Sequence, residues 1–205
     1  MIHIVGPGGA GQTYFTEFLK SNGVNTTRTH DIDNIKHVGS PLDIEKSYKK
    51  LNYYKNVSKC IFIYNDSCKC ILSLIRRAYI THQLKKFGDP YNLLVEKTKN
   101  KTENWYSFIF KKTIDEGKDI SGIEYQFDNW VKYTKLPTLF IHFNDVLKYK
   151  DIIKSFINKD INFDLFEYQY KNRKNNSEII GDFIEIYNKL DNKLRKFSGK
   201  VITNI

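Results

Sequence analysis

The chain has 205 residues, of which 40% are apolar and 15% aromatic, and a formal net charge of +10. This length suits a single domain over residues 1–205 with a full hydrophobic core, and the apolar content excludes a disordered chain. No apolar stretch approaches the roughly 20 residues that span a bilayer, and no signal-peptide pattern occurs, so we expect a soluble, cytoplasmic protein without a membrane contact.

The basic charge favours polyanionic partners such as a nucleotide, a nucleic acid or a sulfated glycan. The lysines are nevertheless spread along the chain, with no block of five or six like charges, which is typical of a solvated basic surface. The three cysteines, Cys60, Cys68 and Cys70, are odd in number and lack the two-residue gap of zinc and redox motifs. They predict neither a disulfide nor a metal cofactor.

The first twenty residues predict a strand, a glycine-rich turn and a helix. Apolar residues 2–5 form the strand, and four of the next six residues are glycine. An amphipathic segment follows, with Tyr14, Phe15, Phe18 and Leu19 on one face. A turn with few side chains exposes its backbone N–H groups, and the helix adds the positive end of its dipole. The stretch therefore predicts a phosphate or sulfate-ester site, and a tight turn without a ligand is the alternative.

The turn has the spacing of a Walker A motif with one departure. Four residues separate Gly6 from Gly11, and Gln12 and Thr13 follow, so that Gln12 stands where nucleotide triphosphatases have lysine. That lysine neutralises the β- and γ-phosphates, whereas a glutamine amide offers hydrogen bonds without charge. The departure therefore weakens a kinase or ATPase interpretation more than it weakens phosphate binding.

Strands and helices alternate along the rest of the chain. We expect further strands at 24–29, 60–64 and 138–142. The continuous apolar run 60–64 indicates burial on both faces, as in a parallel sheet. We expect helices at 43–54, 68–87 (capped by Asp66 or Ser67), 105–112, 123–131, 151–157 and 177–197. This order predicts an α/β fold, a three-layer sandwich around a central, mainly parallel sheet with a P-loop-like phosphate turn.

In order and in kind, these motifs resemble those of the PAPS-dependent sulfotransferases, a P-loop-related family. Residues 10–14 (Ala-Gly-Gln-Thr-Tyr) are similar to the end of the family's first turn, which holds the 5′-phosphosulfate. Residues 28–30 (Arg-Thr-His) resemble a Lys-Thr-His phrase after its second strand. Residues 63–73 resemble a phrase whose Arg and Ser bind the 3′-phosphate, and residues 140–147 resemble a later strand that ends in Tyr-Glu-Asp-Leu.

The resemblance implies that the protein transfers a sulfuryl group from PAPS to a hydroxyl or amine acceptor without a metal. It implies that PAPS, or its product adenosine 3′,5′-bisphosphate, is bound by Pro7, Gly8, Gly9, Ala10, Gly11, Gln12, Thr13, Tyr14, Asn65, Ser73, Arg173 and Lys174. His30 would be the catalytic base, because a neutral imidazole near pH 7 can accept the acceptor's proton. The alternatives are a surface-loop histidine at position 30, a helix-surface serine at 73 and a plain solvated loop at 171–174.

The chain departs from this family where charge is needed. Gly9 stands near the position of the turn's lysine, and Asn65 replaces the arginine that binds the 3′-phosphate. Loss of one preorganised donor can lower a rate by about 10²–10³. Either other cations compensate, or activity is low or absent; the candidate cations are Arg28, Arg76, Arg77, Arg173 and Lys174. Two further functions therefore remain, a catalytically degenerate module that binds nucleotides or polyanions and a P-loop nucleotide kinase.

Overall fold

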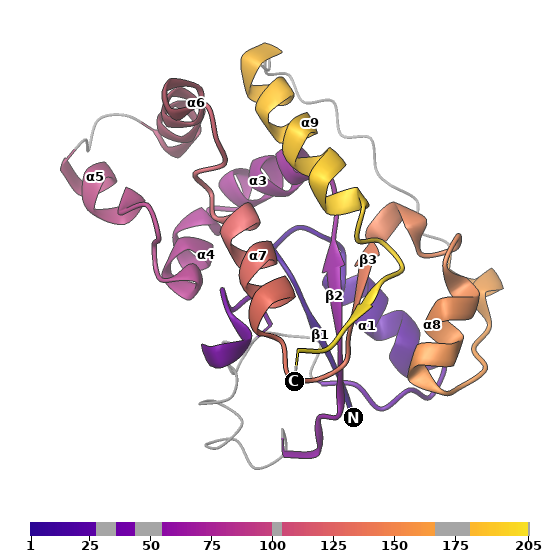
Figure 1. Ribbon diagram of the computed structural model, residues 1–205. Coiled ribbons are helices and arrows are strands. Elements are labelled where there is room, and N and C mark those ends of the chain that lie inside the picture. The colour runs from indigo at the N-terminus through magenta and orange to yellow at the C-terminus, as the bar shows by residue number, and fades with distance from the viewer. Residues whose placement is uncertain (28–35, 44–54, 100–103, 167–180, 205) are drawn as a thin grey trace.

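A four-stranded sheet forms the centre of the computed structural model (Figure 1). Its strands, in spatial order, are β1 (Ile2–Val5), β2 (Lys59–Tyr64), β3 (Thr138–His142) and β4 (Val201–Ile202). The first three are parallel, and β4 runs antiparallel to β3. The expected α/β class with a mainly parallel sheet is therefore confirmed. The structure describes residues 1–27, 36–43, 55–99, 104–166 and 181–204.

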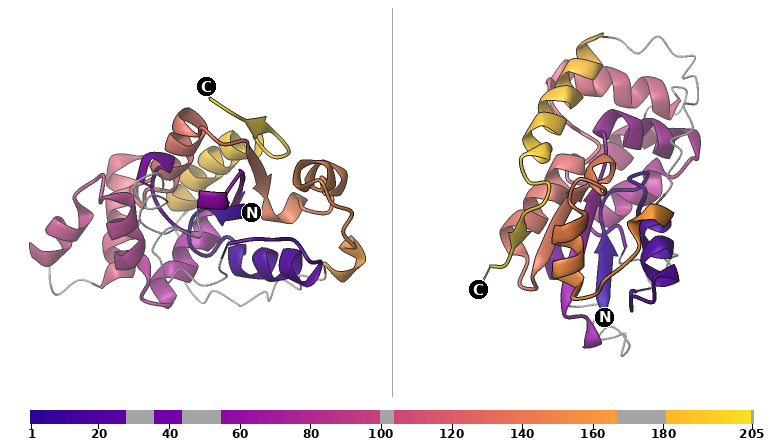
Figure 2. Two further views of the ribbon diagram at one scale, coloured as in Figure 1. Left: turned by 90° about the horizontal axis from the view of Figure 1, so that it is seen from below. Right: turned by 90° about the vertical axis from the view of Figure 1, so that its right-hand side faces the viewer.

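Helices lie on both faces of this sheet (Figure 2). On one face lies α1 (Gln12–Ser21), and on the other lie α7 (Ile123–Tyr133) and α9 (Gly181–Arg195). Further helices are α3 (Ser67–Arg76), α4 (Ile80–Phe87), α5 (Leu93–Lys99), α6 (Trp105–Glu116), α8 (Lys150–Ile157) and the 3-10 turns η2 (Phe143–Asp145) and η3 (Phe163–Leu165). One cluster of buried apolar side chains in the described residues includes side chains from all three parallel strands.

Strand β2 is buried on both of its faces, as its continuous apolar sequence predicts. The ring of Phe62 lies 5.6 Å from that of Phe127 in α7. The hydroxyl of Tyr64 donates to the carbonyl oxygen of Leu194 in α9 at 2.9 Å. Because side chains alternate along a strand, Ile63 between them points to the α1 side. Phe62, Ile63 and Tyr64 are each at most 1% exposed, so β2 is the middle of the core.

The helix expected at 68–87 is two helices, α3 and α4. Ala78 adopts a left-handed conformation with a φ of 57°, which ends α3. The N–H of Tyr79 then donates to the carbonyl oxygen of Leu74 at 2.9 Å, which closes the end of the helix. The periodicity of apolar residues does not reveal this break, because the buried side continues across it. The break directs α4 back toward the end of β1, where Gln83 contacts the chain.

The ends of the other elements also differ from the expectations. Of the expected strand 24–29, residues 24–27 lie beside β1 with one parallel bridge, between Ile2 and Thr26, and residues 28 and 29 lie outside the described residues. Most of the expected helix 43–54 also lies outside them. The last helix ends at Arg195, because the chain then turns at Gly199 and adds β4 to the free edge of β3.

The order of the strands places a topological switch point between β1 and β2. From β1 the chain passes through α1 to residues 24–27, which lie on one side of β1. It later enters β2 on the other side of β1. In open α/β sheets, ligands bind beyond the carboxyl ends of the strands at such a reversal. The residues that follow β1 and β2 are therefore where the fold favours a site.

Phe62→Ala tests whether the core is centred on β2. Phe62 also stacks on Phe140 of β3 at 5.3 Å, so its truncation opens a cavity between strands and helices. We expect a loss of about 3–5 kcal/mol in the free energy of unfolding, measured by urea denaturation. Leu165→Ala, at a side chain that is 65% exposed, is the control and should change the stability little. Equal losses in the two variants would contradict this description of the core.

Candidate functional site

The glycine turn, residues 6–13, follows β1 and leads into α1. Gly11 is the N-cap of α1 with a φ of 89°, and a Cβ there would collide with the ring of Phe143. A Cβ on Gly8 would lie 2.7 Å from the side-chain oxygen of Gln83. These glycines therefore allow η2 and α4 to approach the backbone closely. The sequence predicts that the glycines leave space for a ligand. At Gly8 and Gly11, the side chains of Gln83 and Phe143 occupy the space that a Cβ would take.

Some backbone N–H groups of the glycine turn are used within the protein and others are open. The N–H of Gly6 donates to the carbonyl oxygen of Lys36 at 3.3 Å, and that of Gly8 donates to Gln83 Oε1 at 2.6 Å. Four N–H groups donate to no acceptor among the described residues: those of Gly9, Gly11, Gln12 and Thr13. The last two begin α1, where helix geometry leaves the N–H groups without an intrahelical acceptor. The turn thus retains a cluster of donors for an anion.

The side chain of Gln12 folds back across the glycine turn. It is only 3% exposed, and a Cβ on Gly6 would lie 2.9 Å from its Nε2. No described residue accepts a hydrogen bond from this Nε2. A buried donor without a partner costs about 1–3 kcal/mol, so such groups call for an explanation. An acceptor atom of a ligand in the turn would supply the missing partner.

A cation reaches the glycine turn from a segment that the sequence motifs did not include. The ammonium group of Lys36 donates to Thr13 Oγ1 at 2.9 Å, although 23 residues separate the two. Lys36 is 5% exposed, and desolvation lowers its pKa to about 8. Lys36 lies in a stretch of sequence without a spacing signature. Sequence reasoning missed it for that reason.

His37, the residue after Lys36, also contacts the glycine turn. Its Nδ1 lies 2.9 Å from the carbonyl oxygen of Gly6. Desolvation above all, together with the nearby charges of Lys36 and Arg77, lowers the pKa of His37 to about 4, although the hydrogen bond to Gly6 opposes this shift. The ring is therefore neutral at pH 7, with its Nδ1–H donated to Gly6. Residues 36 and 37 thus hold Gly6 by both its N–H and its carbonyl group.

Helix α3 borders the turn at Gly9, one of the residues whose N–H group has no described acceptor. A Cβ on Gly9 would lie 3.4 Å from the Cβ of Ser73 and 3.1 Å from the carbonyl oxygen of Cys70. Ser73 is half-buried, and its carbonyl oxygen accepts a hydrogen bond from Nε of the exposed Arg77 at 3.0 Å. The structure thus brings Ser73, one of the expected nucleotide contacts, beside the turn together with Arg77.

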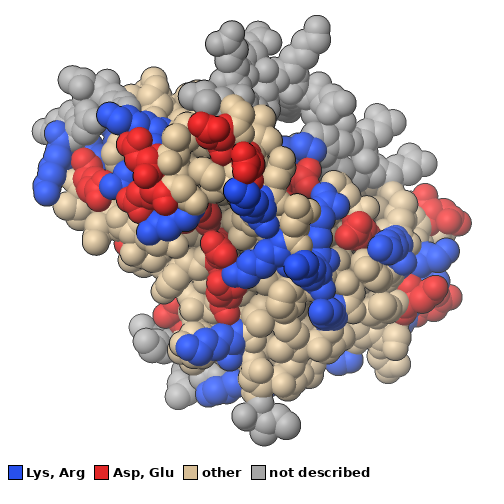
Figure 3. Space-filling view, turned by 45° about the horizontal axis from the view of Figure 1, so that its top comes forward, with Lys and Arg blue, Asp and Glu red and all other residues tan. Residues whose placement is uncertain are grey.

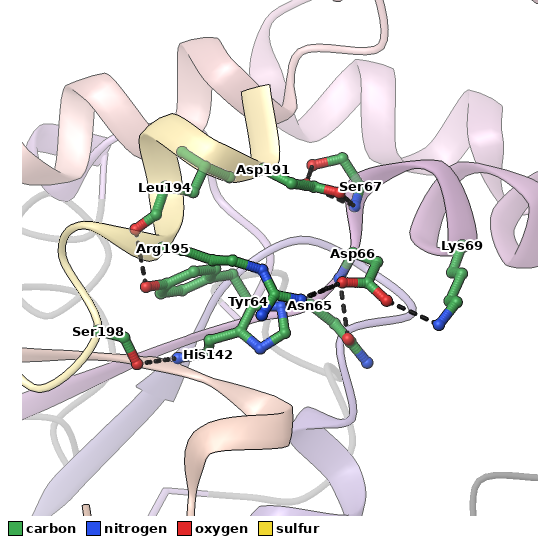
Figure 4. A network of polar contacts seen from close by, with 10 residues as sticks. All are labelled: Tyr64, Asn65, Asp66, Ser67, Lys69, His142, Asp191, Leu194, Arg195 and Ser198. Atoms are coloured by element: carbon green, nitrogen blue, oxygen red, sulfur yellow. Dashed lines mark hydrogen bonds and ion pairs between the residues drawn. The ribbon is translucent and has the colours of Figure 1, made fainter. Parts of the chain in front are cut away.

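The end of β2 carries a network of ion pairs rather than an unpaired cationic site (Figure 4). Asn65, expected at the 3′-phosphate, accepts the N–H of Asp66 on its own side-chain oxygen at 2.8 Å. Asp66 contacts His142 Nε2 at 3.4 Å, Lys69 at 2.7 Å and Arg195 at 2.8 Å. These three groups, His142 first, hold the pKa of the Asp66 carboxyl well below its usual range. Asp66 is therefore ionised and already paired.

The N-terminus of α3 is capped from the far end of the chain. Asp66 and Ser67 were the expected caps, but neither makes a side-chain cap bond. Instead, Asp191 of α9 accepts the N–H of Ser67 at 2.9 Å and its hydroxyl at 2.6 Å (Figure 4). Burial raises the pKa of Asp191. A carboxylate of the protein thus fills the helix terminus where the sulfotransferase resemblance implies a 3′-phosphate.

Some of the other expected ligand contacts lie within the described residues, and the rest lie outside them. Pro7 and Ala10 are buried in the turn, and Tyr14 packs edge-on to Phe143 and Phe166 at 6.2 and 5.3 Å. The expected base and the basic loop lie outside the described residues, namely His30, Arg173 and Lys174. The candidate cation Arg28 lies outside them as well.

The described part of the chain contains no group of three or more His, Cys, Asp or Glu side chains that could hold a metal ion. The three cysteines are free thiols. No helix in the described ranges is long and apolar enough to cross a membrane. On the face drawn in Figure 3, basic side chains gather in the middle with acidic side chains on either side, so the positive charge is not a uniform patch there.

The fold and site define an α/β protein with a glycine turn at the switch point of a mainly parallel sheet. Comparisons with protein-family models, with curated proteins and with solved structures find no match to this chain.

Two substitutions of Asp191 test the cap on α3. Asp191→Ala leaves the N–H and hydroxyl of the buried Ser67 without an acceptor and should lower the free energy of unfolding by about 1–3 kcal/mol. Asp191→Asn keeps one acceptor oxygen and removes a charge that burial disfavours, so it should cost less. Urea denaturation at pH 7 measures both. An equal loss would mean that the contact with Ser67 is not what Asp191 contributes.

Proposed function

We propose that the glycine turn binds the 5′-phosphosulfate of PAPS and that the protein transfers the sulfuryl group to a hydroxyl or amine acceptor. The observation that carries this proposal is the contact of Lys36 with Thr13, which supplies a cation to a turn whose own sequence lacks one. The open N–H groups of the turn and its place at the switch point support the same ligand.

Sulfuryl transfer requires stabilisation of a developing charge. The acceptor atom forms a bond to sulfur while the bond between sulfur and the bridging oxygen breaks, and adenosine 3′,5′-bisphosphate leaves with the additional negative charge. The N–H groups of the turn and the ammonium of Lys36 would stabilise that charge. The acceptor's proton would pass to a base. We propose His30 as this base on the resemblance alone, since His30 lies outside the described residues.

The residues present fit the two ends of PAPS unequally. The 5′ end fits the turn, where Gln12, Lys36 and four N–H groups offer donors. The end of β2 does not fit a 3′-phosphate, because Asp66 and Asp191 occupy it. Two described residues that a 3′-phosphate would meet instead are Ser73, beside Gly9, and Arg77, which donates to the carbonyl oxygen of Ser73.

That mismatch favours a second candidate, a phosphate-binding protein whose ligand lacks a 3′-phosphate. Two carboxylates near the N-terminus of α3 repel an added anion. A nucleotide that ends in a 5′-phosphate would use the turn without meeting them. A P-loop kinase, which would bind Mg·ATP, and a binding module without catalysis both belong to this candidate.

A thermal-shift series separates the candidates. On the sulfotransferase proposal, adenosine 3′,5′-bisphosphate should raise the melting temperature more than AMP, the matched ligand that lacks the 3′-phosphate. A ligand at 100 times its Kd adds about 2.7 kcal/mol to the free energy of unfolding, so the tighter ligand gives the larger shift at equal concentration. Transfer of sulfuryl from labelled PAPS to a panel of phenols, alcohols and amines then tests the reaction.

The same series gives the opposing results. No shift with the bisphosphate at millimolar concentration would count against the sulfotransferase proposal. A larger shift with AMP, or with ATP and Mg²⁺, would favour the second candidate. A shift with heparin that disappears as salt is raised, without any nucleotide effect, would indicate a polyanion-binding module.

A further inference from the structure

The glycine turn contains donors that the protein itself does not use. Gln12 Nε2 has no described acceptor, and neither has Nε2 of Gln83, whose Oε1 accepts the N–H of Gly8. Both side chains are 3% exposed, so water does not readily replace the missing partner. Two unpaired amide donors at one turn, together with the open N–H groups of α1, indicate a site built for acceptor atoms.

We propose that Lys36 is the cation of this site, and that its ammonium and the amide of Gln12 together bind the terminal tetrahedral oxyanion, sulfuryl or phosphoryl, of the ligand. In this arrangement a charge from outside the motif replaces the lysine that position 12 lacks. This inference rests on the proposed function only for the place of the anion, and it assigns a role to Lys36, which the resemblance does not include.

The geometry fixes Lys36 relative to the turn. Its ammonium lies 2.9 Å from Oγ1 of Thr13, whose own N–H is one of the open donors. Its backbone carbonyl accepts the N–H of Gly6, and the ring of His37 holds the carbonyl of Gly6. The ammonium and the turn therefore move as one unit, so the charge is preorganised for an anion.

The charges around Lys36 make anion binding depend on pH. Desolvation lowers the pKa of Lys36 to about 8, Glu17 raises it and Lys20 lowers it. Arg77 adds positive charge near His37, where it contributes to the lowered pKa of that ring. A bound anion favours the protonated form of Lys36 and raises its pKa. Binding is therefore strongest below pH 8 and weakens as the pH rises through 8 toward 9.

Inorganic sulfate is the probe, because its charge is constant between pH 6 and 9. Calorimetric titrations at pH 8, in buffers of different ionisation enthalpy and at constant ionic strength, measure the protons taken up. We expect the wild-type protein to take up about half a proton per sulfate, since a group with a pKa near 8 is half protonated there. Lys36→Arg should bind sulfate with no proton uptake and with equal affinity at pH 7 and 9.

Substitutions then locate the charge. Lys36→Met should weaken sulfate binding at pH 7 at least tenfold, and Gln12→Leu should weaken it to a smaller extent. Lys36→Met combined with Gln12→Lys, which returns the cation to the motif, should restore binding. Lys189→Met removes a lysine whose side chain is 74% exposed and should behave as the wild type. Far-UV circular dichroism and melting temperatures show which variants are folded.

Three results would overturn the inference: no sulfate binding by the wild-type protein at pH 7, wild-type affinity in folded Lys36→Met, or proton uptake that persists in Lys36→Arg. The last comparison keeps the test decisive even where Lys36→Met does not fold.

Failure of the inference differs from failure of the proposed function. Sulfate binding that depends on Lys36, without sulfuryl transfer from PAPS, supports the inference and contradicts the sulfotransferase proposal. Transfer that is unchanged in Lys36→Met does the reverse.

Discussion

The burial of β2 between two helical layers is the constraint on which the rest of the structure depends. A strand buried on both faces needs hydrogen-bonded strands at both edges, and β1 and β3 supply them in parallel register. Parallel pairing requires long crossover connections, so helices must cover both faces (Figure 2). The same geometry directs the carboxyl ends of three strands to one edge. The glycine turn, the Asp66 network and η2 therefore lie at that edge.

At that edge, close packing within the protein uses glycines that the proposed ligand site would also need. Phe143 and Gln83 contact the turn at Gly11 and Gly8, where any larger residue would displace them. These contacts hold the backbone rigidly, which is also what a preorganised anion site needs. The glycine pattern alone therefore does not separate a structural turn from a binding turn. The unpaired amide of Gln12 and the ammonium of Lys36 are the observations that support the proposed binding turn, because packing alone requires neither.

The network around Asp66 explains why the end of β2 differs from a nucleotide site. Lys69 and Arg195, which are available cations by sequence, are already paired with Asp66. Asp191 satisfies the first N–H of α3 and joins α9 to the end of the sheet (Figure 4). Anions at this terminus are thus supplied by the protein.

The sequence by itself determined the α/β class, the parallel strands β1, β2 and β3, the helix after the glycine turn, the helix that begins at Ile123, and the turn between β1 and α1. These features depend on local periodicity and on glycine spacing, which the sequence displays directly. Only the tertiary structure decided the break at Ala78, the short strand β4, the cap by Asp191 and the contact of Lys36 with Thr13. The last three depend on packing between segments that are distant in the chain. The break depends on the left-handed backbone conformation of Ala78, a residue type that usually continues a helix. Distance in sequence hides such contacts, since no spacing rule relates residue 36 to residue 13 or residue 191 to residue 67.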